Sequence, residues 1–208
     1  MSRALRALAA SVPLALAACA IVEPVPMMGS ASIAADFDTY RLQRVALLPF
    51  RAVDRTSGAL AAHEVGTLET SFHAELAAGT PYDLIPLRGE DLAAVLPPDP
   101  FRDGWYTPDA IRLLRDRFHL DGVMVGTITS RRVVPPQVLG VQLDLISCET
   151  GATIWSADLM LDAARNDVQD AVAAWSKGDL GKDDGGAMVL LSPRRYAHFA
   201  AYQLARLL

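Results

Sequence analysis

The sequence predicts a single mixed α/β domain, built on a mixed sheet of about five strands with an antiparallel C-terminal hairpin and flanked by helices. Three observations support this fold class. Strand-like apolar segments alternate with segments of helical periodicity, the 208 residues suit one domain, and residues 138–161 show a two-face hairpin pattern. The composition, 51% hydrophobic and 21% charged, is that of an ordinary globular protein.

The hairpin from Val138 to Leu161 is the most strongly patterned stretch. A three-residue loop, Glu149-Thr150-Gly151, with Gly151 in the left-handed position sets its register. The expected opposite pairs are Leu145 with Trp155, Leu143 with Ala157, Val141 with Leu159, Leu139 with Leu161, Asp144 with Ser156, and Gln142 with Asp158. Apolar residues then share one face and polar residues the other, as a half-buried antiparallel pair requires.

The elements before the hairpin follow from periodicity and stop signals. Residues 44–50 read as a buried strand that ends at Pro49-Phe50. Beyond Gly58, apolar residues spaced by three or four predict a helix that Gly79 and Pro81 end. A short strand at 82–87, a brief helix at 89–96, a helix capped by Thr107-Pro108 and an interior strand at 120–129 follow.

Two helices are expected after the hairpin. The first follows Asp162, with Ala164, Val168, Val172 and Trp175 on one stripe, and ends near Gly178. A polar, glycine-rich loop spans residues 177–186. Ser192-Pro193 then caps a terminal helix.

The N-terminus has the pattern of an export signal, with Arg3 and Arg6 before an apolar stretch too short to span a membrane. Leu16-Ala17-Ala18-Cys19 resembles the bacterial lipobox, which implies cleavage before Cys19 and its acylation. Ala20 in place of Asp favours the outer membrane. The alternatives are an ordinary secretory signal with an incidental Cys19, or a buried N-terminal helix. The expected organisation is a signal peptide at 1–18, a lipidated Cys and flexible tether at 19–43, and the domain at 44–208.

No motif in the chain predicts catalysis, a cofactor or a metal. The four histidines do not stand at metal-ligand spacing, and the i, i+4 pair Glu69 and His73 reads as a surface pair. There is no GxSxG, P-loop or dinucleotide-binding motif. The formal charge of −5, without basic runs, argues against nucleic acid. We therefore expect a protein that is not an enzyme.

After signal cleavage and acylation of Cys19, Cys148 is the remaining cysteine. We interpret it as a small buried filler, the alternative being a redox or nucleophilic thiol. Two pairs of arginines break local rules and are candidate partner-binding residues: Arg131 and Arg132 before the hairpin, and Arg194 and Arg195 in the first turn of the last helix. They are either solvated or ion-paired, or they face an anionic lipid headgroup, glycan phosphate or acidic protein.

Three segments resemble a family of periplasmic α/β domains. They are Val45-Ala46-Leu47-Leu48-Pro49-Phe50, the strand Asp121 to Ile128, and the hairpin with Thr150-Gly151 before Ile154-Trp155. Such domains occur in CsgG-like secretion lipoproteins, in lipoprotein activators of penicillin-binding proteins, and at the N-terminus of the Tol-system propeller protein. Cys148 departs from the family, which often has an acid just before the turn.

The resemblance and the lipobox together imply a function. We expect a non-catalytic lipoprotein anchored in the outer membrane, on its periplasmic face, that acts as an adaptor or assembly module for an envelope protein or glycan. The alternative is a subunit of an oligomeric, CsgG-like secretion pore, although no second alternating hairpin is seen for a membrane barrel. An envelope hydrolase is the third possibility.

Overall fold

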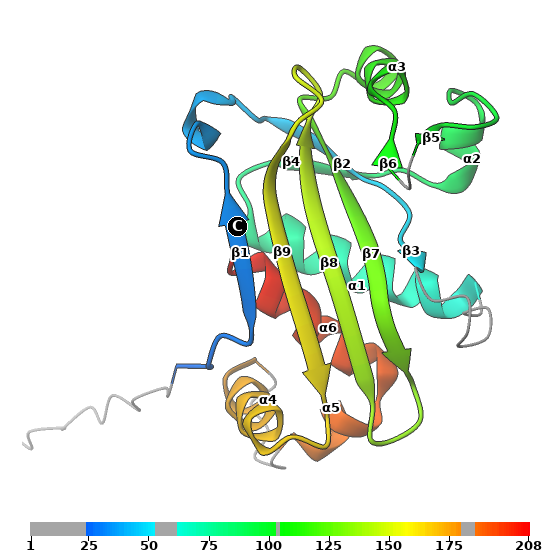
Figure 1. Ribbon diagram of the computed structural model, residues 1–208. Helices are drawn as coiled ribbons and strands as arrows, with labels where there is room; N and C mark the ends of the chain where they lie inside the picture. Colours follow the sequence, from blue (N-terminus) through cyan, green and yellow to red (C-terminus); the bar gives the residue numbers. More distant parts are fainter. Residues whose placement is uncertain (1–23, 53–61, 103–104, 180–185) are drawn as a thin grey trace, which may run out of the picture.

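The computed structural model describes residues 24–52, 62–102, 105–179 and 186–208 (Figure 1). Cys19 and the segment before it lie outside the described residues. The strands are β1 (Gly29–Ile33), β2 (Arg44–Leu47), β3 (Arg51–Ala52), β4 (Asp83–Pro86), β5 (Phe101–Arg102), β6 (Trp105–Tyr106), β7 (Gly122–Arg132), β8 (Val138–Ser147) and β9 (Thr153–Asp162). The helices are η1 (Phe37–Thr39), α1 (Ala62–Gly79), α2 (Gly89–Ala93), α3 (Pro108–Phe118), α4 (Asn166–Asp179), α5 (Ala187–Leu191) and α6 (Pro193–Ala205).

The mixed α/β class is confirmed, with a larger sheet than expected. Its strands run in the order β1-β9-β8-β7-β2-β4, and β3 also pairs with β7, so the described sheet has seven strands rather than about five. β2 is parallel to β4 and β7, and β3 is parallel to β7, whereas the pairs β7–β8, β8–β9 and β9–β1 are antiparallel. Within this sheet, β1 and the two-residue β3 were not expected, and neither was the separate two-stranded sheet of β5 and β6.

The register of the β8–β9 hairpin is confirmed for all six expected pairs, from Gln142 opposite Asp158 to Leu145 opposite Trp155. Gly151 has φ +73° and its N–H donates to the carbonyl of Ser147 (2.8 Å), as the left-handed turn position requires. The register shifts between Leu145 and Ile146, next to the turn.

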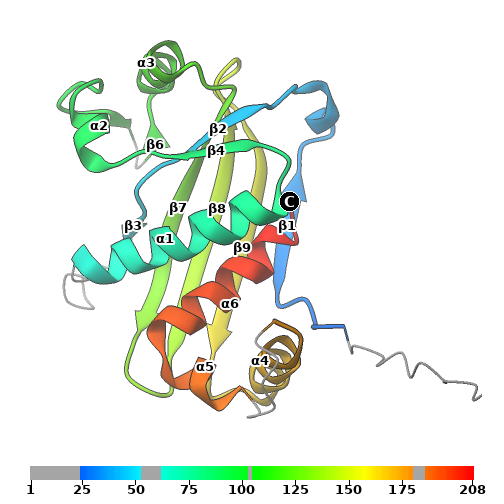
Figure 2. The same ribbon diagram turned by 180° about the vertical axis from the view of Figure 1, so that it is seen from behind.

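Both faces of the central strands are buried, which explains why the residues of β2 after Arg44 are all apolar. Val45 and Leu47 belong to one apolar cluster with α1, α4 and α6, while Ala46 and Leu48 belong to a second cluster with α2 and α3. Figures 1 and 2 show α1 and α6 side by side across one face of the sheet. α2 and α3 lie at the end of the sheet where β8 turns into β9, which we call the upper end.

The helix signals in the sequence are confirmed. Thr107 caps α3 through its side chain, which accepts from the N–H of Ala110 (3.2 Å), and Ser192 caps α6 by accepting from Arg195 (3.4 Å). The helix after Asp162 begins later than expected, at Asn166, and leaves Ala164 outside it. Among the described residues no helix is long and apolar enough to cross a membrane.

The prediction of a flexible tether up to residue 43 is wrong for the part that the structure describes. β1 pairs with β9 at the edge of the sheet. Just before it, the amide of Gln203 in α6 accepts from the N–H of Met28 (3.0 Å) and donates to the carbonyl of Pro26 (3.0 Å). Arg206 donates to the carbonyl of Val25 (2.9 Å). We call these contacts of Gln203 the Gln203 clasp.

A second correction concerns the segment before the hairpin. The structure continues β7 through Arg131 and Arg132, which pair with Leu139 and Val138 of β8. The two arginines therefore belong to the sheet rather than to an exposed extended lead. The loop that joins β7 to β8 lies at the opposite end of the sheet from the β8–β9 turn, and we call this the lower end (Figure 1).

Candidate functional site

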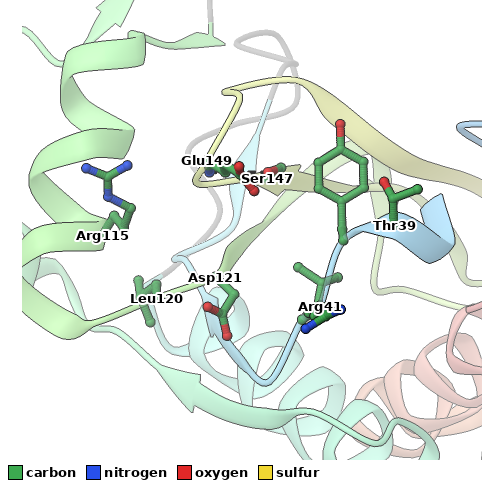
Figure 3. Close-up of a pocket in the computed structure, with 9 residues that line it drawn as sticks. Thr39, Arg41, Arg115, Leu120, Asp121, Ser147 and Glu149 are labelled. Atoms are coloured by element: carbon green, nitrogen blue, oxygen red, sulfur yellow. Dashed lines mark hydrogen bonds between the residues drawn. The ribbon is translucent and has the colours of Figure 1, made fainter. Parts of the chain in front are cut away.

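A hollow of about 380 Å³ opens at the upper end of the sheet (Figure 3). Three segments far apart in the sequence form it: the chain that leads into β2, the end of α3, and the β8–β9 turn. Its lining residues are Thr39, Tyr40, Arg41, Leu42, Arg115, Leu120, Asp121, Ser147 and Glu149. In Figure 3, Arg115 and Arg41 lie on opposite sides of the hollow. Side chains of both charges line it, so it suits a polar ligand better than an apolar one.

Asp121 holds one wall of the hollow in place. Its Oδ2 accepts the backbone N–H groups of Gln43 (2.9 Å) and Arg44 (2.8 Å). Its own N–H donates to the carbonyl of Arg44 (2.8 Å). Such charge-assisted bonds to backbone N–H groups fix the start of β2 beside β7. The carboxylate therefore has a structural task in the folded domain.

Two further polar side chains of the hollow, those of Ser147 and Arg115, also bond to the protein itself. The buried hydroxyl of Ser147 accepts from the N–H groups of Glu149 (3.2 Å) and Thr150 (3.4 Å), which shapes the turn. Nε of Arg115 donates to Asp116 (2.9 Å). Among the residues that line the hollow, none is a nucleophile beside a general base.

Cys148 is buried, with 4% of its surface exposed, and packs in the apolar cluster with α2 and α3. Burial raises the pKa of its thiol to about 12, and Asp121 adds to the effect while Arg115 opposes it. A thiol with that pKa carries almost no thiolate near neutral pH. The structure thus agrees with the interpretation of Cys148 as a packing residue.

A second concave region is an apolar groove of about 510 Å³ between β3, α2 and the β5–β6 ribbon. Its lining residues are Pro49, Phe50, Arg51, Gly89, Leu92, Ala93, Leu96, Pro97, Pro98, Pro100, Phe101 and Tyr106. The guanidinium carbon of Arg51 lies 5.0 Å from the ring centre of Phe101 and 5.9 Å from that of Tyr106. This stacking holds the charged group over aromatic rings at one side of the groove. Burial raises the pKa of Tyr106, and Arg51 partly offsets that rise.

Two of the four histidines, His73 and His198, contact the protein itself. His73 lies 3.2 Å from the carbonyl of Leu84, and its helix neighbour Glu69 accepts from the N–H of Phe50 (3.0 Å). Both side chains therefore tie α1 to neighbouring backbone instead of forming a surface pair. His198 lies 3.4 Å from Glu75 of α1. Within the described ranges, no group of three or more His, Cys, Asp or Glu residues is arranged to hold a metal ion.

The structure separates the four candidate arginines into different environments at the lower end of the molecule. Arg131 is partly buried, and its charge lowers the pKa of Tyr196, against the larger effects of burial and of Asp162, which raise it. Arg132 is exposed, donates to the carbonyl of Pro136 (2.7 Å) and lies 3.9 Å from Asp162. Their role in partner binding stays a prediction.

Arg194 and Arg195 stand in the first turn of α6, where Arg194 is exposed and Arg195 is partly buried. Their side chains make no hydrogen bond or ion pair with any residue that the structure describes. Neither arginine pair lines the hollow or the groove. The four arginines that break local rules in the sequence therefore lie at the lower end, and none of them lines either concave region.

Sequence reasoning missed three features that position possible sites: Asp121 in the hollow, the stack of Arg51 on Phe101, and the Gln203 clasp. The first two could have been suspected from an acid directly before a strand and from the aromatic residues around the proline-rich loop. The clasp joins positions 175 or more residues apart, and its amide has no distinguishing pattern.

Comparisons with known proteins find similar folds but no family. No family model and no curated protein matches the chain. Among solved structures, the PelC dodecamer from Paraburkholderia phytofirmans is similar over 81% of this chain and 98% of that one, at 18% identity and a TM-score of 0.43.

Two further solved structures show the same level of similarity. Lipoprotein GNA1162 from Neisseria meningitidis is similar over 57% of this chain and 79% of its own, at 13% identity and a TM-score of 0.40. The LpoB C-terminal domain from Salmonella enterica is similar over 58% and 84%, at 17% identity and a TM-score of 0.40. At such values the similarity does not extend to function.

Proposed function

We propose that this chain is a lipid-anchored, non-catalytic binding module of a bacterial envelope, held by acylated Cys19 at the periplasmic face of the outer membrane. One structural observation carries the proposal beyond the lipobox-like sequence. The chain is fastened to the domain from Val25 onward, through Arg206 and the Gln203 clasp. Only 25 − 19 = 6 peptide units separate Val25 from Cys19. Six units reach about 20 Å at most, so the anchor would keep the whole domain against its membrane.

The binding part of the proposal rests on the two concave regions. The β8–β9 turn and α3, which line the hollow, and α2, which lines the groove, lie at the upper end, away from the point where the described chain begins (Figure 1). In the hollow, Asp121 and Ser147 accept hydrogen bonds from backbone N–H groups. In the groove, the guanidinium of Arg51 stacks on the rings of Phe101 and Tyr106. Such surfaces suit recognition of another envelope component. The partner would be a protein or a glycan of the envelope.

Replacement of Cys19 tests the anchor. Cys19→Ser should move the protein from the membrane fraction to the soluble fraction, and the mature N-terminus should lose its acyl mass. The matched control is Cys148→Ser, which removes the buried thiol and should leave the protein in the membrane fraction. Membrane association of Cys19→Ser equal to that of the control would contradict the proposal.

An open sheet edge favours a second function, a subunit of an oligomeric envelope assembly. β1 pairs with β9 on one side, and on its other side no strand of the described residues pairs with it. An edge without proline or charge, here Gly-Ser-Ala-Ser-Ile, is open to pairing with another chain. Light scattering of the detergent-extracted protein distinguishes the two functions, since the module would be a monomer and the assembly a closed oligomer.

A further inference from the structure

Exposed apolar side chains gather at the lower end of the molecule. Val134 in the β7–β8 loop is 67% exposed, and Leu191 and Met188 of α5 are 58% and 51% exposed. Val134 and Leu191 are the two most exposed of the large apolar residues that the structure describes. The loop and the helix are more than 50 residues apart in the sequence, yet both lie at this end in Figures 1 and 2.

The β7–β8 loop and α5, which carry these side chains, contact each other. The buried amide of Gln137, at the end of the β7–β8 loop, donates to the carbonyl of Leu190 in α5 (2.8 Å). α5 leads through Ser192 directly into the first turn of α6. We call residues 131–137 and 187–195 together the basal surface.

The charge of the basal surface is positive. It contains Arg131, Arg132, Arg194 and Arg195, and neither of its two segments contains Asp or Glu. Among the described residues, Asp162 of β9 lies beside it, 3.9 Å from Arg132. The chain as a whole has a formal charge of −5, so an apolar surface with positive charge differs from the rest of the molecule.

The anchored end of the chain emerges at the same end of the molecule. In Figures 1 and 2 the described chain begins beside α4, at the lower end, and continues upward into β1. Six peptide units from Cys19 reach about 20 Å, so an acylated Cys19 would bring this end to the bilayer. Because the acylated end and the basal surface would lie at the same end of the molecule, the bilayer would be the partner nearest to the basal surface.

We propose that the basal surface docks on an anionic lipid bilayer, with Val134, Met188 and Leu191 at the headgroup boundary. Arg132, Arg194 and Arg195 would face the lipid phosphates, whereas two of the guanidinium nitrogens of Arg131 are buried. This inference rests on the proposed lipid anchor. Apolar side chains with flanking cations are the composition of interfacial membrane contacts. Each arginine near an anionic membrane surface strengthens binding of the protein to the membrane about fivefold. Such a second contact, added to the lipid anchor, would also fix the orientation of the domain on the bilayer.

Depth measurement on the acylated protein tests the apolar part. Nitroxide labels on Leu191→Cys and Val134→Cys, in a Cys148→Ala background, are compared in phosphatidylglycerol-containing vesicles. The matched control is Leu113→Cys on α3, an exposed leucine at the upper end. Labels at 191 and 134 should be more accessible to oxygen than to a water-soluble nickel chelate, and the label at 113 should show the reverse. Equal water accessibility at all three sites would overturn the proposal.

Vesicle binding of the non-acylated chain tests the charges. All described elements lie within residues 24–208, so a chain that begins at residue 19 with Cys19→Ser contains the whole fold. It should bind vesicles with phosphatidylglycerol and hardly bind phosphatidylcholine alone. Arg194→Gln with Arg195→Gln should weaken binding about 25-fold, at fivefold for each arginine. Arg112→Gln on α3 is the control and should have no effect.

The outcomes separate this inference from the proposed anchor. The non-acylated chain tests the basal surface without the lipid, whereas fractionation of Cys19→Ser tests the lipid alone. Absence of vesicle binding, or binding unchanged by Arg194→Gln with Arg195→Gln, would contradict the docking of the basal surface on the bilayer. It would not contradict the proposed acylation of Cys19. Immobilisation of the labels at 134 and 191 without vesicles, rising with protein concentration, would assign the surface to a second copy instead.

Discussion

The Gln203 clasp should determine how far the domain can move from its anchor. Gln203 is fully buried, and its amide makes one bond as acceptor and one as donor to residues 26–28. Gln203→Leu keeps the volume of the side chain and removes both bonds. Residues 26–28 lie near the surface, so water can satisfy the groups that are released. The variant should therefore loosen the chain before β1 without opening the core.

The size of the effect follows from the two hydrogen bonds. Each contributes about 0.5–1.5 kcal/mol net, so local opening becomes easier by about 1–3 kcal/mol. That is a loss of about 5- to 150-fold in hydrogen-exchange protection of the Met28 amide. If residues 25–28 are released, the chain between Cys19 and the first residue still held by the domain, Gly29, lengthens from 6 to 10 peptide units. At full extension, 10 units reach about 35 Å.

Amide exchange followed by mass spectrometry or NMR measures this directly. The matched control is Gln169→Leu, which removes one bond to the carbonyl of Ala163 (2.9 Å) and should leave Met28 protected. Unchanged exchange at Met28 in Gln203→Leu, with the global unfolding midpoint also unchanged, would refute the reasoning, because something other than the clasp would then hold the segment.

Two further predictions concern packing and the thiol. A Cβ at Gly126 would lie 2.3 Å from the ring of Phe50, so Gly126→Ala should lower the free energy of unfolding by about 1–3 kcal/mol, whereas Gly66→Ala, with open space, should raise it by up to about 1 kcal/mol. Equal urea midpoints would contradict this. At pH 8, iodoacetamide should alkylate native Cys148 at least about 1000-fold more slowly than unfolded protein, because burial raises its pKa from 9.0 to about 12. The unfolded thiol ionises first, so the stability that Cys148 contributes should fall as pH rises from 9 toward 12, a loss that Cys148→Ala would not show. A native alkylation rate equal to the unfolded rate would refute this.

The parts of the fold that were predictable are those that local pattern determines. Alternation of apolar and polar residues in the middle of β8 and β9, with one glycine at the turn, favours one register, because a shift by one residue would move the apolar set to the other face. Ser192 and Thr107 carry the chemistry of a helix cap in their own side chains. In these cases the information lies within a few residues of the element it specifies.

The parts that were missed depend on segments that meet only in the folded chain. β1, with the sequence Gly-Ser-Ala-Ser-Ile, has small residues and no strong alternation, and it becomes a strand because β9 offers an open edge. The hollow combines residues from 39–42, 115–121 and 147–149, and the groove combines β3 with residues 89–106. No local sequence pattern indicates that these distant segments come together, so neither concave region could be predicted from the sequence.

The geometry of the sheet relates the two ends of the molecule to each other. β7 has 11 residues, and at about 3.3 Å per residue it separates the lower end from the upper end by about 36 Å. That distance exceeds the roughly 20 Å that the six peptide units between Cys19 and Val25 can span. If the lower end contacts the bilayer, the hollow therefore stands well beyond the headgroups, and the anchor is too short to let the domain invert. A partner that binds the hollow would have to meet it at that height, so lengthening the segment between Cys19 and Val25 should impair partner binding without changing the affinity of the isolated domain.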